Sequence, residues 1–168
     1  MPILHDIPEV LQSAEALRTD GILRLLTGKN GRLEIPNAAS PCLIAVLCGQ
    51  MRLRGPFGVV SVKSGQYMTT DFDTPLVIDV EADKDRAFAA ALVPLLTSEI
   101  VEIVIALEQS LIEDILAQRL GESHFRDEDM AVFDVLLRLA RSAASERSSA
   151  FLVKTLRAEL IFHVLVGR

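Results

Sequence analysis

The stretch "CLIAVLCGQMRLRG", residues 42–55, gives the clearest indication of the fold, because a glycine separates two short apolar segments within it. The first segment is continuously apolar, whereas the second alternates, with Met51 and Leu53 on one side and Arg52 and Arg54 on the other. Alternation with a period of two residues is typical of a β-strand. We therefore expect two consecutive strands, with both arginines in water on an outer face.

Segments of the same kind surround this stretch, from Arg32 to about Val80. They are β-branched or alternating, and Gly, Pro or Asp separates them: "RLEIP", "GVVSVKSG", "QYMTTDF" and "LVIDVEA". Regularly spaced short strands of this kind predict a sandwich or a barrel. In "VKSGQYMTTDFDTPLVIDV", Gly65 supplies a turn, Tyr67 begins a strand and Pro75 ends the pairing, which predicts a hairpin.

Helices are expected on both sides of this β-rich region. Residues 8–27 have apolar side chains at helical spacing, and Pro8 suits a first helical turn. In the second half of the chain we expect one helix from about Glu99 to Arg119, which Thr97 or Ser98 can cap. Two further helices are predicted at about 127–144 and 149–166, each from its apolar period.

The segment "AFAAALVPLL", residues 87–96, is ambiguous from its composition. Its alanines favour a helix, but Pro94 fits badly in a helix interior. Both a helix and a strand therefore remain open for this segment.

Charge and hydropathy exclude several classes of protein. The formal net charge is −6 over 168 residues. This charge disfavours binding to nucleic acid, because contact with phosphates needs clustered Lys and Arg. No apolar run approaches the roughly 18 residues of a membrane span. The N-terminus carries acidic residues and no basic region, so it is not a secretory signal. We expect one soluble, cytoplasmic domain with no membrane partner.

The two cysteines are expected to be reduced. Cys42 and Cys48 lie six residues apart, and in a strand this even spacing puts both thiols on one face, roughly 20 Å apart. A disulfide between them is excluded at that separation.

Two parts of the sequence resemble the N-terminal domain of AraC-type transcriptional regulators. In that family a strand ending in glycine, a hairpin, a "pGqY" turn, a short strand and a Pro follow one another. The residues at these positions are Gly49, Gly65, Gln66, Tyr67 and Pro75. The tail "VKTLRAELIFHVLVGR" resembles the closing helix of the family, through Arg157, Glu159, Leu160, Leu165 and Gly167. The resemblance covers roughly residues 30–168.

The resemblance implies an α+β fold built on a small cupin-like β-barrel of the jelly-roll type. The barrel would cover residues 30–96, with Ala87 to Leu95 as its final strand. An N-terminal helical segment, residues 1–28, would precede it, and a C-terminal helical bundle, residues 97–168, would follow. In the family this domain senses an effector or supports dimerisation, and helix-turn-helix motifs further along the chain bind DNA. This chain stops where those motifs begin, so we expect no DNA binding by it alone.

The resemblance implies that the domain senses an effector, and the residues themselves give the candidate site. We expect a pocket inside the barrel, because pockets are mostly apolar with a few convergent polar groups. The candidate residues are Cys48, Met51, Tyr67 and Thr69. A filled barrel, in which Tyr67 bonds to the backbone and the domain serves only dimerisation, stays open as an alternative.

A cupin-type metal enzyme is the other alternative, and the residues disfavour it. Cupin metal sites need histidines from neighbouring strands, but His5, His124 and His163 all lie outside the expected barrel. The chain has no G-x-S-x-G motif and no phosphate-binding glycine pattern. We expect no catalytic residue, no metal and no cofactor.

The predicted helix from Glu99 to Arg119 carries two apolar stripes, and a single packing partner cannot cover both. One stripe contains Ile100, Ile103, Val104, Leu107 and Leu111. The second contains Val101, Ile105, Ile112 and Leu116, which we expect at the interface of a two-fold homodimer. Alternatively, the two helices that follow bury both stripes within one subunit.

Overall fold

The computed structural model describes residues 4, 6–9, 22–35, 41–55, 58–70, 76–107, 109, 111–113, 125–126, 129–145 and 149–166. Its strands are β1 (Arg24–Gly28), β2 (Gly31–Ile35), β3 (Cys42–Cys48), β4 (Gln50–Gly55), β5 (Gly58–Lys63), β6 (Tyr67–Thr70), β7 (Leu76–Glu81), β8 (Phe88–Pro94) and β9 (Phe125–Arg126). Its helices are α2 (Thr97–Ala106), α4 (Met130–Ala144) and α5 (Ala150–Val166).

The strands form two antiparallel sheets. One has the order β1-β8-β3-β6-β9, and the other has the order β2-β7-β4-β5. Without the two-residue strand β9, these are the two four-stranded sheets of a jelly roll, in which successive hairpins fold over into a sandwich. The predicted fold class, a cupin-like jelly roll combined with helices, is therefore confirmed.

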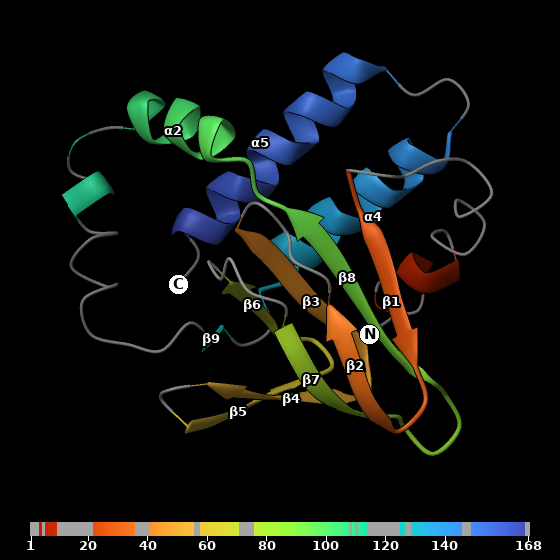
Figure 1. Ribbon diagram of the computed structural model, residues 1–168. Coiled ribbons are helices and arrows are strands. Elements are labelled where there is room, and N and C mark those ends of the chain that lie inside the picture. Colours follow the sequence, from red (N-terminus) through yellow and green to blue (C-terminus); the bar gives the residue numbers. More distant parts are fainter. Residues whose placement is uncertain are drawn as a thin grey trace.

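The layers are arranged so that the β1-β8-β3-β6 sheet lies in the middle. The second sheet covers one of its faces, and α4 and α5 lie across the other (Figure 1). Two apolar clusters result. The sandwich core, between the sheets, includes Ile44, Val46, Met51, Val62, Met68, Ile78, Phe88 and Ala90. The helix-side core, between the middle sheet and the helices, includes Leu43, Ala45, Tyr67, Ala91, Phe133, Leu136, Leu139 and Leu160.

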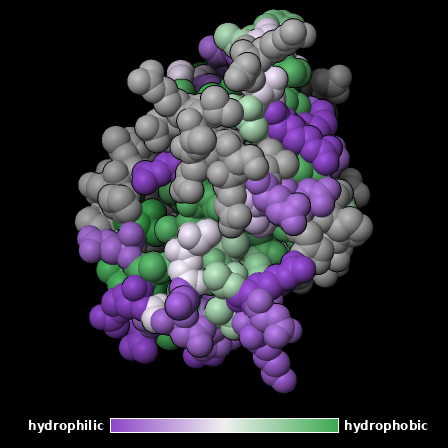
Figure 2. Space-filling view, turned by 90° about the vertical axis from the view of Figure 1, so that its right-hand side faces the viewer, coloured by the Kyte–Doolittle hydropathy of each residue, from purple (hydrophilic) through white to green (hydrophobic). Residues whose placement is uncertain are grey.

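The patterns along β3 and β4 follow from these layers. β3 lies in the middle sheet and is buried from Cys42 to Leu47, so apolar residues occupy both of its faces. β4 lies in the outer sheet, where Met51 and Leu53 face the sandwich core and Arg52 and Arg54 are exposed. The expectation of solvated arginines is met. Acidic partners from β7 lie beside them, with Arg52 2.8 Å from Glu81. On the face that Figure 2 shows, the lower part of the molecule is mostly hydrophilic.

The alanine-rich segment is the strand β8, as the family resemblance implies. It pairs with β1 on one side and with β3 on the other, so tertiary pairing overrides the helical propensity of the alanines. Ala89 and Ala91 belong to the helix-side core, whereas Ala90 faces the sandwich core. Pro94 is the last residue of the strand, where the loss of a backbone donor disturbs little.

The helix predicted over residues 8–27 is wrong at its C-terminal end. Residues 24–28 form β1, which pairs with β8 in register from Arg24 to Gly28, so the sheet begins earlier than residue 30. Backbone pairing to a strand more than sixty residues away leaves no local signal. Residues 6–9 are helical, and 10–21 lie outside the described residues.

The predicted helices of the second half are confirmed with corrected ends. α4 and α5 start within three residues of the expected positions. α2 ends at Ala106 because Leu107 is extended, although residues 109 and 111–113 are again helical. The expected cap is also wrong, since Leu96 occupies the N-cap position and no side chain bonds there. No helix within the described part of the chain is long and apolar enough to cross a membrane.

Candidate functional site

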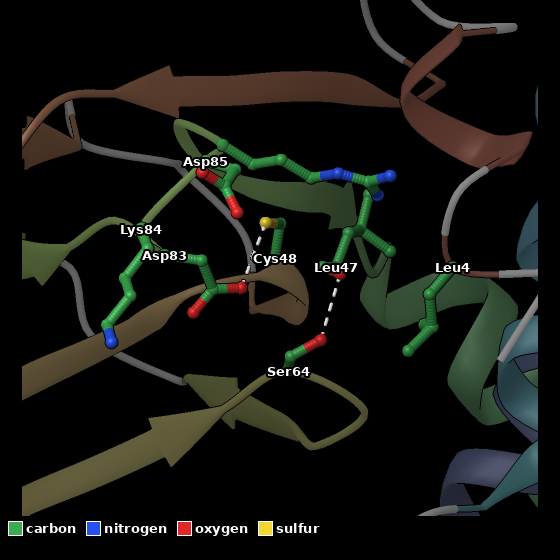
Figure 3. Close-up of a pocket in the computed structure, with 8 residues that line it drawn as sticks. Leu4, Leu47, Cys48, Ser64, Asp83, Lys84 and Asp85 are labelled. Atoms are coloured by element: carbon green, nitrogen blue, oxygen red, sulfur yellow. Dashed lines mark hydrogen bonds between the residues drawn. The ribbon is translucent and has the colours of Figure 1, made fainter.

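A hollow opens at one end of the jelly roll, below the N-terminal segment (Figure 3). It has a volume of about 410 Å³, and its lining residues are Leu4, Leu47, Cys48, Ser64, Asp83, Lys84, Asp85 and Arg86. A second hollow of about 330 Å³ adjoins it and shares Leu4, Cys48 and Arg86. The second hollow adds Thr27 from β1 and residues 87–89 at the start of β8.

The lining comes from segments that are far apart in the sequence. The end of β3 supplies Leu47 and Cys48, the turn before β6 supplies Ser64, and the connection between β7 and β8 supplies residues 83–86. Gly49 makes the close approach of two of these segments possible. Its φ is +78°, and a Cβ atom there would lie 2.4 Å from the carbonyl oxygen of Glu81. Only glycine fits this position without a shift of the backbone.

A β-bulge turns Cys48 toward the hollow. The pairing of β3 with β8 shifts between Val46, opposite Ala90, and Cys48, opposite Ala89. Such an extra residue reverses the faces of those that follow it. Cys42 therefore faces the sandwich core and Cys48 packs against the helix-side core. The expectation that both thiols share one face is wrong, and both cysteines are free thiols.

Asp83 organises the polar part of the hollow. Its Oδ2 accepts hydrogen bonds from the Cys48 thiol, at 3.3 Å, and from the Gly49 amide, at 3.2 Å. The Ser64 hydroxyl donates to the carbonyl oxygen of Leu47, at 2.9 Å. These bonds hold the rim at the end of β3, and Figure 3 shows the Cys48 sulfur pointing toward Asp83. The hollow thus has a fixed polar side and an apolar side.

Burial and the neighbouring carboxylate both raise the pKa of the Cys48 thiol, and burial is the larger cause. We predict that Asp83→Asn speeds the reaction of Cys48 with iodoacetamide at pH 8 by about threefold, because losing the negative charge lowers this pKa and increases the thiolate fraction. Mass spectrometry of the alkylated chain measures the rate at each cysteine. Cys42 is the internal control, since its thiol is buried and 3.0 Å from the Thr70 hydroxyl. An unchanged or slower Cys48 rate would contradict the prediction.

The four residues predicted for the effector site do not meet in one pocket. Cys48 lines the hollow, but Met51 is fully buried in the sandwich core and Tyr67 lies in the helix-side core. Thr69 is half-buried on β6. Met51 and Tyr67 thus lie on opposite sides of the middle sheet. The residues that face the other sheet from β6 are its even-numbered ones, such as Met68.

The hollow contains residues that sequence analysis missed, above all 83–86 and Leu4. One signal was available: a charged run, "EADKDR", directly follows a strand, and loops at the ends of a sandwich often carry the binding residues. Leu4 offered no such signal. No local pattern indicates that a residue near the N-terminus lies against the end of β3.

The residues predicted for a dimer interface are only partly described. Val101 is 47% exposed and Ile105 is 78% exposed on α2, whereas Ile112 is half-buried and Leu116 lies outside the described residues. The other stripe of α2 packs against the helix-side core through Ile100, Ile103 and Val104. The helices that follow therefore do not bury both stripes in the described part of α2.

Metal ligands do not cluster in the described part of the chain. No group of three or more His, Cys, Asp or Glu side chains there is arranged to hold an ion. His163 lies in the last turn of α5, with its ring against that of Phe162, and His5 and His124 lie outside the described residues.

The fold and the hollow define a cupin-like jelly-roll domain with attached helices and an open, mixed-polarity hollow at one end. The sequence pattern of the family described as "AraC-type transcriptional regulator N-terminus" matches residues 23–168. The chain belongs to this family, as its resemblance indicated. The comparison with curated proteins gave no match.

Solved structures of ToxT from Vibrio cholerae share the fold. An apo variant of ToxT has a TM-score of 0.56 at 7% identity, over 81% of this chain and 52% of that one. Another ToxT structure has a TM-score of 0.50 at 10% identity, over 80% and 53%. The chain therefore spans about half the length of the ToxT chains it matches. At these identities the likeness shows the fold alone.

Proposed function

We propose that this chain is the effector-binding and dimerisation domain of a cytoplasmic AraC-type regulator, and that the end hollow and the second hollow that adjoins it together form its effector site. Family membership supports the regulatory role, and the mixed lining of the hollow is the observation that carries the site. Helix-turn-helix motifs of the whole regulator would bind DNA. The domain itself is proposed to be non-catalytic.

The lining suits a small amphipathic molecule. Leu4 and Leu47 supply apolar contacts, and Ser64 and the charged residues 83–86 supply polar ones, which is the usual composition of a small-molecule pocket. A ligand in the hollow would touch the N-terminal segment, the end of β3 and the connection before β8 at the same time. Binding would therefore tie the N-terminal segment to the jelly roll.

The effector site is tested by filling the hollow. Ala87 is exposed and lines the second hollow, so Ala87→Trp places an indole there without disturbing the core. A ligand at about 100 times its dissociation constant adds about 2.7 kcal/mol of stability, which raises Tm by about 5–10 °C for a domain of this size. A thermal-shift screen of small metabolites should find such a ligand for the natural chain and lose the shift in Ala87→Trp.

The matched control is Val59→Trp, because Val59 is 63% exposed on β5 and does not line either hollow. The control should keep the full shift. A ligand that shifts Ala87→Trp as strongly as the natural chain would contradict this site. A complete screen without any shift would favour the alternative, a structural module that only dimerises.

We also propose a homodimer, with Val101, Ile105, Ile112 and Leu116 of one protomer meeting those of its partner. Val101 and Ile105 are the exposed large apolar residues of α2. Sedimentation of the natural chain at tens of micromolar should give a dimer, and Ile105→Glu should raise the dissociation constant at least tenfold. Val59→Glu, on an exposed strand position, is the control. A monomeric natural chain would refute the dimer.

A further inference from the structure

Arg157 joins three parts of the molecule from the middle of α5. Its side chain is 9% exposed. Its Nε donates to Oε1 of Glu99 at 2.8 Å, and its Nη2 donates to Oε2 of the same carboxylate at 2.6 Å. The guanidinium also donates to the carbonyl oxygen of Pro94, at 2.7 Å, and to that of Ile22, at 3.3 Å. Arg157 thus connects α5 with the first turn of α2, with the end of β8 and with Ile22, which lies just before β1.

The hydrogen bonds between Arg157 and Glu99 are strong because of their geometry and their burial. A planar guanidinium that meets a carboxylate with two parallel hydrogen bonds forms one of the strongest polar contacts in proteins, and exclusion of water strengthens it further. The hydrogen bond from Arg157 lowers the pKa of Glu99, the expected effect of a partner that favours the ionised form. The carbonyl oxygens of Pro94 and Ile22 accept from two of the three remaining N–H groups.

α2 has little else to hold it. None of its residues is buried, and its inward stripe of Ile100, Ile103 and Val104 is only partly covered. The other ion pair between α2 and α5 joins Glu102 to Lys154 at 3.4 Å, with side chains 64% and 71% exposed, and such surface pairs contribute little. In Figure 1, α2 meets α5 near the end of β8 and then extends away from the sheets.

We propose that the Arg157–Glu99 pair is a latch, and that α2 opens from α5 as a unit when the latch breaks, while the jelly roll stays folded. A helix held by one buried ion pair, one exposed ion pair and half-covered apolar side chains opens more easily than the doubly buried strands β3 and β8. The latch needs neither an effector nor a dimer. If the proposed dimer is also correct, opening would change how Val101 and Ile105 are presented to a partner.

Amide hydrogen exchange of the full chain, followed by mass spectrometry, tests the latch. Glu99→Gln keeps the shape of the side chain but removes the charge that Arg157 needs. We expect the amides of α2 to exchange at least tenfold faster in this variant, while those of β3 and β8 keep their rates. Glu102→Gln removes the same charge one turn away, from the exposed pair, and should change α2 by less than twofold.

The natural chain provides a second measurement that needs no variant. In low concentrations of guanidinium chloride, the amides of α2 should exchange through an opening that depends weakly on denaturant, whereas those of β3 and β8 should follow global unfolding. Exchange of α2 and β8 with one common dependence would overturn the latch. Equal rates for α2 in Glu99→Gln and in the natural chain would overturn it as well.

Discussion

Replacing Arg157 by methionine is expected to lower the free energy of unfolding by about 3 kcal/mol, because it removes one partner of a buried ion pair. The change also leaves the carbonyls of Pro94 and Ile22 without their donor. The loss should lie near the lower end of the range for such pairs, since Glu99 can turn toward water once α2 opens. Urea unfolding followed by circular dichroism measures it.

Arg138 provides a matched control on the neighbouring helix. It also makes a forked contact with a glutamate, Glu159 of α5, and it pairs with Asp134 at 3.0 Å, but its side chain is 42% exposed. Arg138→Met should cost less than about 1 kcal/mol, because exposed pairs contribute little. Equal losses for the two methionine variants would show that burial of Arg157 has no special effect.

The double variant Arg157→Met with Glu99→Leu distinguishes the net contribution of the ion pair from the cost of leaving Glu99 without its partner. Replacing both members of a buried pair by apolar residues is often close to neutral. We expect this variant to recover at least half of the stability lost in Arg157→Met, because the two new apolar side chains would hold α2 against α5 in place of the buried ion pair.

Replacing Phe88 by alanine is expected to cost about 3–5 kcal/mol, the usual loss for a fully buried phenylalanine. Phe88 has no exposed surface, packs in the sandwich core at the start of β8 and lines the second hollow. Both sheets contribute to the packing around it, so neither can close the cavity without moving the other. The midpoint of thermal unfolding should fall by about 6–20 °C.

Phe88→Leu is the control for this second variant. It keeps an apolar side chain of intermediate volume and should cost less than half as much. A loss below 1 kcal/mol in Phe88→Ala would mean that the two sheets collapse onto the cavity, and that the jelly roll is softer than its packing indicates.

Some elements could be predicted from the sequence because their signals are local. The alternation around Met51 and Leu53 requires only one buried face, and it identified β4 together with its outward arginines. The 3.6-residue period likewise identified α4 and α5, since each packs one face on the protein. The turn at Gly65 was also correct, and its φ of +85° explains the glycine.

The tertiary structure alone decided the rest. β1 and β8 are strands because they pair with each other across more than sixty residues, and burial on both faces removes the alternation from β8. A bulge orients Cys48 toward the hollow, and Leu4 and the connection before β8 complete the lining. The periodicity of a sequence shows only which face of a single helix or strand is buried. The hollow and the Arg157 junction depend on which elements meet, and only the packing of the whole chain fixes that.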